Sequence, residues 1–98
     1  MNANEYINGM ADLIRTTGAE YVKVEDIDGR KRIAAKFHSV GEMNSEMKKA
    51  FIANAETLKA LNAGLKALRA TGEIKSATNC WAPTLLEGGI ELRMDFGF

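Results

Sequence analysis

The sequence is poor in the residues that form covalent, metal or catalytic centres, with one cysteine, one histidine and one proline among 98 residues. The single cysteine, Cys80, cannot form an intramolecular disulfide, and no second cysteine or histidine stands at metal-ligand spacing from it. Cys80 and His38 are the only thiol and imidazole available for a catalytic pair, and they fall in different predicted strands. We therefore expect neither an enzyme nor a protein with a metal or other cofactor.

Long apolar runs and net charge are also lacking. No apolar run approaches the ~20 residues that span a bilayer, and the N-terminus has no basic-then-apolar export signal. We therefore expect a cytoplasmic protein, or one of the host cytoplasm if its source is viral. The 13 basic and 13 acidic side chains cancel, although the middle of the chain is basic and both ends are acidic. This distribution fits a surface for an acidic partner, or charges that neutralise each other within the fold or between protomers.

The most extended pattern predicts one long helix over residues 40–71, because apolar residues recur there at intervals of three and four. Ser39 and Glu42 form a capping box at its start, and Gly72 can take the left-handed conformation that ends it. The side expected to be buried consists of Val40, Met43, Met47, Phe51, Ala55, Leu58, Leu61, Leu65 and Leu68.

A second side of this helix has small residues, with Ala53, Ala60 and Ala67 at every seventh position. These alanines indicate either a surface at which another backbone packs closely, or no more than the high helix propensity of alanine. Asn54 projects near the middle of the apolar side, where its amide needs a hydrogen-bond partner such as its counterpart in a symmetry-related helix. These four residues, together with Arg93 in the last predicted strand, are the candidate dimer interface.

The remaining elements follow from the same periodicities. They are a helix over 2–17, strands over 21–27 and 30–37 joined by an Asp28-Gly29 turn, a strand over 74–81, a loop over 82–89, and a strictly alternating strand over 90–98. The expected fold class is α+β, a two-layer sandwich of order α-β-β-α-β-β in a single domain, residues 1–98. Its four-stranded antiparallel sheet would have both helices, including the long one, on one face.

The register of the hairpin can be predicted from its side chains. A two-residue turn places Val24 opposite Ile33 and Glu25 opposite Arg32, so apolar meets apolar and charge meets opposite charge. The outward face then carries Tyr21, Lys23, Arg30, Arg32 and Lys36. Basic groups interleaved with an aromatic ring can hold a phosphate backbone, although solvated sheet faces are often basic without binding anything.

The predicted loop contains a second candidate surface. Leu85 and Leu86 would be exposed in a free loop, close to Trp81. They either fold back over the edge of the core or form, with Trp81, an apolar lip for a partner protein. The three residues are therefore candidate partner-binding residues, beside those of the hairpin face.

The function expected from these features is that of a non-catalytic protein-binding module that forms a homodimer through the long helix or the C-terminal strand. Its size and lack of motifs are typical of small phage-encoded inhibitors, which occlude a surface of a host enzyme or defence complex. The alternative is a nucleic-acid-binding protein that uses the basic hairpin face. A small-molecule sensor with a pocket between the helices and the sheet is a third interpretation.

Overall fold

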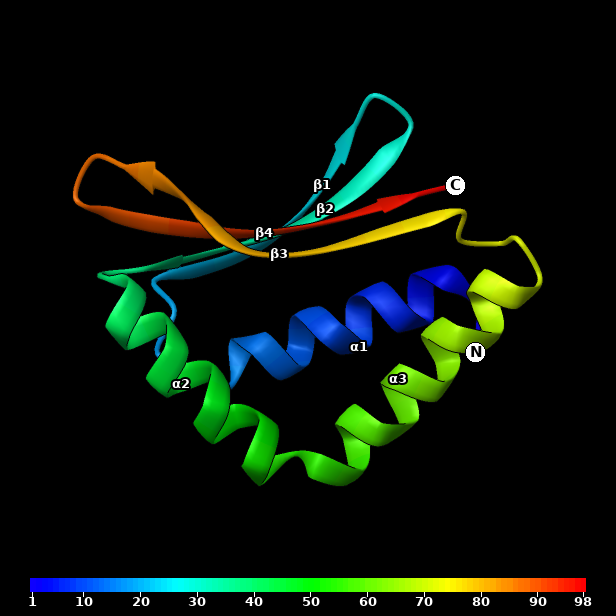
Figure 1. The fold of residues 1–98 in the computed structure, drawn as a ribbon, viewed down its shortest axis with the longest axis horizontal. Helices are drawn as coiled ribbons and strands as arrows, with labels where there is room; N and C mark the ends of the chain where they lie inside the picture. Colours follow the sequence, from blue (N-terminus) through cyan, green and yellow to red (C-terminus); the bar gives the residue numbers. More distant parts are fainter.

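The computed structural model places the backbone of residues 1–98, and the described side chains are those of residues 1–78 and 83–98. The elements are, in order, α1 (Ala3–Arg15), β1 (Tyr21–Ile27), β2 (Arg30–Phe37), α2 (Val40–Ala53), α3 (Ala55–Ala70), β3 (Ser76–Leu86) and β4 (Gly89–Gly97). All three helices lie on the same side of an antiparallel sheet (Figure 1). The α+β class is confirmed, while the layout differs from the prediction in the long helix and in the last two strands.

The sheet has the strand order β1-β2-β4-β3, so β4 is a central strand, and β1 and β3 are the edges. The hairpin has the predicted register, with Val24 opposite Ile33. Its turn residues, Asp28 and Gly29, have φ angles of 48° and 75°. A type I′ turn requires positive φ at both positions, which explains why this dipeptide was a reliable signal.

The predicted loop over residues 82–89 is wrong, because β3 continues to Leu86 before a short turn leads into β4. The two strands pair in two segments that are separated by a register shift between Cys80 and Thr84. Across this shift three residues of β3 face one residue of β4, which makes a bulge. Pro83 lies in the bulge, where its missing N–H interrupts no regular ladder.

The predicted single helix over residues 40–71 is two helices, α2 and α3, which meet at Asn54 and form a V (Figure 1). The Asn54 backbone has φ −118° and ψ 35°, outside the helical region. Its side-chain amide Nδ2 donates to the carbonyl of Ala50 at 2.8 Å, and its backbone N–H donates to the same carbonyl at 2.9 Å. A short amide side chain that occupies a helix carbonyl in this way favours a helix end.

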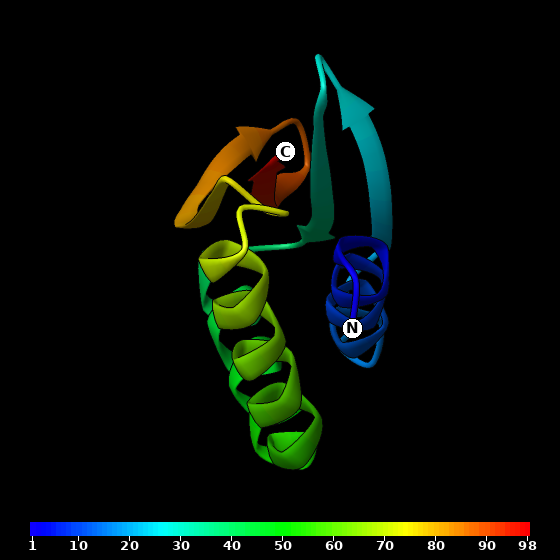
Figure 2. The same ribbon diagram turned by 90° about the vertical axis from the view of Figure 1, so that its right-hand side faces the viewer.

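The core lies between the sheet and α1, which packs against β1 and α3. Figure 2 shows α1 beneath the β1 side of the sheet and the α2–α3 pair beneath the β3 side. On α1, Tyr6 and Ile14 are almost fully buried, and the rings of Tyr6 and Phe96 form a T-shaped pair at a centroid distance of 5.5 Å. In α3 only Leu61 and Leu68 are buried, so α2 and α3 cover the core less completely than α1 does.

Candidate functional site

The candidate site is the outer face of the sheet, defined as the face opposite the helices. The register aligns its residues in rows across β1, β2 and β4, because side chains alternate between the two faces of a strand. The rows are Tyr21, Lys36 and Glu91; then Lys23, Ala34 and Arg93; then Glu25, Arg32 and Asp95. β4 thus places two acids and an arginine beside the predicted basic hairpin face.

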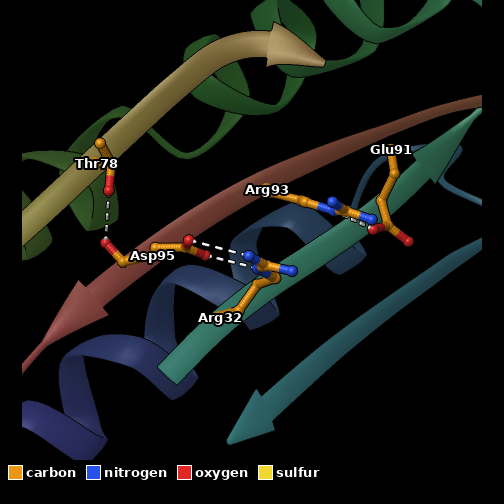
Figure 3. A network of polar contacts seen from close by, with 5 residues as sticks. All are labelled: Arg32, Thr78, Glu91, Arg93 and Asp95. Carbon is orange, nitrogen blue, oxygen red and sulfur yellow. Dashed lines mark hydrogen bonds and ion pairs between the residues drawn. The ribbon is translucent and has the colours of Figure 1, made fainter. Parts of the chain in front are cut away.

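Arg32 and Asp95 form a two-pronged ion pair on this face (Figure 3). Arg32 Nε donates to Asp95 Oδ1 at 2.7 Å, and Nη2 donates to Oδ2 at 3.2 Å. The two side chains are only 22% and 24% exposed. The hydrogen bonds from Arg32 lower the pKa of Asp95, and the same contact raises the pKa of Arg32. Such bidentate pairs hold both side chains in one orientation.

Glu91 is the buried acid of the outer face, with 8% of the residue exposed. One carboxylate oxygen, Oε1, accepts a hydrogen bond from Arg93 Nε at 2.6 Å, and the other, Oε2, accepts one from the Tyr21 hydroxyl. Burial alone would raise the pKa of Glu91, but the hydrogen bonds from Tyr21 and Arg93 prevail and lower it. The hydrogen bond to Glu91 raises the pKa of Tyr21 to about 12. At neutral pH this contact therefore joins a phenol to a carboxylate.

Two further contacts complete the layer. Lys23 Nζ lies 4.3 Å from the centre of the Tyr21 ring, within the range of a cation–π interaction, and Lys36 Nζ lies 3.0 Å from Glu20 Oε2. Ala34 is fully buried although it lies on the outer face. The polar side chains around this alanine therefore form a packed layer rather than a loose solvated surface.

The predicted basic face is thus largely neutralised within the chain. Among the described side chains, Lys23 and Arg30 are the basic groups of the hairpin without an ion-pair partner, whereas Lys31, Arg32 and Lys36 each have one. The alternation over residues 90–98 indicates that Glu91, Arg93 and Asp95 share a face. It does not indicate which strand they lie beside, so sequence reasoning missed all three as partners of the hairpin.

The predicted apolar lip is only partly described. Leu85 is 82% exposed, and Leu86 is half-buried. Leu85 pairs with Ile90 on the helix side of the sheet, so neighbouring Leu86 points to the outer side, and the two do not share a surface. The side chain of Trp81 lies outside the described residues.

The candidate dimer residues lie on different parts of the fold, the alanines and Asn54 on the α2–α3 pair and Arg93 on the sheet. Ala53, Ala60 and Ala67 are exposed on the helices. Asn54 already has a partner, the Ala50 carbonyl of its own chain. Arg93 lies on β4, which pairs with β2 on one side and with β3 on the other, so the C-terminal strand has no free edge on which a second chain could pair.

The pKa shifts of the outer face move both Glu91 and Tyr21 further from neutral pH. They hold Glu91 ionised and Tyr21 protonated over a wider pH range than usual, whereas a general acid or base works best with a pKa near the working pH. Among the described residues, no three His, Cys, Asp or Glu side chains gather as metal ligands. The helices in the described part of the chain are too short or too polar to cross a membrane.

Comparison of this chain with protein-family models, with curated proteins and with solved structures gives no match.

Proposed function

We propose that this protein is a non-catalytic protein-binding module that covers a surface of a larger protein with the outer face of its sheet. The observation that carries the proposal is the fixed polar layer, in which Arg32–Asp95 and Tyr21–Glu91–Arg93 hold one another in place. Side chains that are already ordered lose little entropy on binding. A surface of alternating charge also selects its partner by complementary potential.

The acids of β4 favour a protein partner over a nucleic acid. Glu91 and Asp95 lie among the basic groups and occupy Arg93 and Arg32, which leaves fewer cations for phosphates. Nucleic-acid affinity comes mainly from unpaired basic groups, and the chain as a whole has no net positive charge. Lys23 and Arg30 remain available, and they are the outer-face cations that would meet acidic groups of a partner protein.

A pull-down from the source cell's lysate tests the proposal. Lys23→Glu combined with Arg30→Glu should abolish capture of the partner, because both side chains are exposed cations of the outer face and neither has an ion-pair partner among the described side chains. The control, Lys48→Glu combined with Lys66→Glu, makes the same charge change on the helices and should leave capture intact.

Nuclease treatment separates the two classes of partner. Capture that survives nuclease and is lost in the outer-face variant supports protein binding. Capture that disappears with nuclease, or that the helix variant removes instead, contradicts the proposal. In its specific form the module is a small inhibitor of the phage type, so the purified partner should lose activity when this protein is added in excess. If the activity of the partner is unchanged, the inhibitor interpretation is contradicted, while the proposal of protein binding is not.

A further inference from the structure

The two edges of the sheet differ sharply in charge. β1 has three charged residues among its seven, Lys23, Glu25 and Asp26. β3 is the longest strand, with 11 residues, and none of them is charged. Edge strands usually carry charges that discourage pairing with another chain. β3 pairs on one side only, with β4, and forms the outer border of the sheet in Figure 2.

The uncharged strand is bounded by residues of opposite charge. Lys75 precedes it, Glu87 follows it, and both are exposed. Neither has an ion-pair partner among the described side chains. If two copies pair β3 with β3 in antiparallel fashion about a two-fold axis at position 81, each Lys75 lies opposite Glu87 of the partner. Both charged pairs form at once, because a two-fold axis makes every contact twice.

We propose that β3 is a self-association edge, at which two copies of this chain join their sheets in this register. The faces of the two sheets match in the same register. Ala77 and Leu85 both lie on the helix side, opposite Phe96 and Ile90 of β4, and they come to lie opposite each other across the axis. A register shifted by one residue would place helix-side residues of one copy opposite outer-side residues of the other, so Ala77 and Leu85 would no longer meet.

The bulge is compatible with this pairing. It lies between Cys80 and Thr84, near the axis, so the regular contacts are two short ladders on either side of it. Each ladder joins Ser76–Thr78 of one copy to Thr84–Leu86 of the other. Pro83 falls in the irregular centre, where no ladder needs its missing N–H.

The pairing also accounts for Leu85, which is 82% exposed in the single chain. Opposite Ala77 of the second copy, which packs at the margin of that copy's core, its side chain leaves water. The two sheets become one continuous sheet with both outer faces on the same side. The pairing does not require that the outer face bind a partner.

Charge reversal at the ends of β3 tests the pairing by sedimentation equilibrium at low salt. Lys75→Glu alone or Glu87→Lys alone turns two attractive pairs into two repulsive ones and should weaken the dimer at least about tenfold. The double variant, Lys75→Glu with Glu87→Lys, swaps the charges and should restore dimerisation. Both substitutions fall at exposed positions outside regular elements, so loss of the fold is not expected in any of the three variants.

Lys66→Glu on α3 makes the same charge change away from β3 and should leave the dimer unchanged. Restoration by the charge swap, with no effect of Lys66→Glu, supports the pairing. The proposal is overturned by a wild-type chain that is monomeric at all micromolar concentrations, or by a double variant as weak as the single ones. It is likewise overturned by a dimer that Ala60→Glu on α3 dissociates, since that dimer would form through the helices.

Discussion

The two faces of the sheet share one backbone and differ in almost every other respect. On β2, Ile33 and Phe37 face the helices and are 1% exposed. Arg32 and Lys36 face the other way, and charged partners hold both in place. Ala34 is completely buried on that polar side. A sheet face without a helix layer can therefore still be a packed surface, with ion pairs and hydrogen bonds in place of apolar contacts.

The two faces should respond differently to substitution and to pH. The helix side is stabilised by apolar burial, which decreases when a buried side chain is made smaller and does not depend on pH. The outer side depends on directional contacts between charges, which are individually weaker and respond to protonation.

Substitutions at two neighbouring residues of β2, one on each face, should lower the unfolding free energy by unequal amounts. Phe37→Ala removes a buried ring and should cost roughly 3–5 kcal/mol of unfolding free energy. Lys36→Ala, one residue away, removes a contact with the exposed acid Glu20 and should cost less than about 1 kcal/mol. Urea unfolding at neutral pH measures both variants. Equal losses would show that the outer layer is as important for stability as the core.

Glu91→Gln tests the buried carboxylate of the outer face. It removes the charge that Tyr21 and Arg93 contact, and we expect a loss of about 1–3 kcal/mol. The Tyr21 phenol should also titrate at lower pH, because the pKa of about 12 depends first on its hydrogen bond to Glu91. Ultraviolet absorbance follows this titration. Glu25→Gln on the same face removes only a smaller charge effect on Tyr21 and should shift its titration less. A Tyr21 titration that Glu91→Gln leaves unchanged would contradict the assigned contact.

Gly29→Val tests the turn that sets the register of the hairpin, and with it which side chains lie on each face. The φ of 75° at Gly29 is costly for a β-branched residue, and we expect a loss of about 1–2 kcal/mol in urea unfolding. A Cβ at this position meets no atom within 4 Å, so the loss would come from the backbone alone. Gly41→Ala, at an ordinary helical position, should be neutral or stabilising. Unchanged stability of Gly29→Val would argue against the type I′ turn.

Acidification should weaken the outer face first. The pKa values of Asp95 and Glu91 are lowered in the folded chain, so the unfolded chain takes up protons at higher pH. The stability that these acids contribute is thus complete at neutral pH and is lost as the pH falls below about 4. Urea midpoints measured from pH 7 to pH 3 should fall less in a variant that combines Asp95→Asn with Glu91→Gln. Identical pH profiles would refute the role of these acids.

The predictions from sequence succeeded where the signal was local. The turn at Asp28-Gly29 and the cross-strand pairs of the hairpin determine its register within 20 residues. The bend at Asn54 was signalled by a polar residue on an apolar side, but periodicity alone did not separate a helix break from a dimer contact. The loop predicted over residues 82–89 is instead strand up to Leu86, with Pro83 in a bulge, because tertiary pairing with β4 overrides the local signal.

The candidate site could be predicted only in part for a different reason. The basic side chains of the outer face were identified correctly from the hairpin. Their neutralisation by Glu91 and Asp95 depends on β4 lying next to β2, and that strand order is a non-local choice that periodicity does not encode. Where strands far apart in sequence meet, the charge of a face is a property of the fold rather than of any one segment.

The central position of β4 has a consequence for how the chain folds. Both hairpins can form locally, but the sheet is joined only when Phe37 pairs with Ile90 and Arg30 with Gly97, across nearly the whole intervening chain. Closing so large a loop is costly in entropy, and neither hairpin is stable alone. We therefore expect docking of the two hairpins, with α1 beneath them, to limit the folding rate. Until that step, one side of β2 and one side of β4 remain unpaired, and in this interval the chain is most open to aggregation.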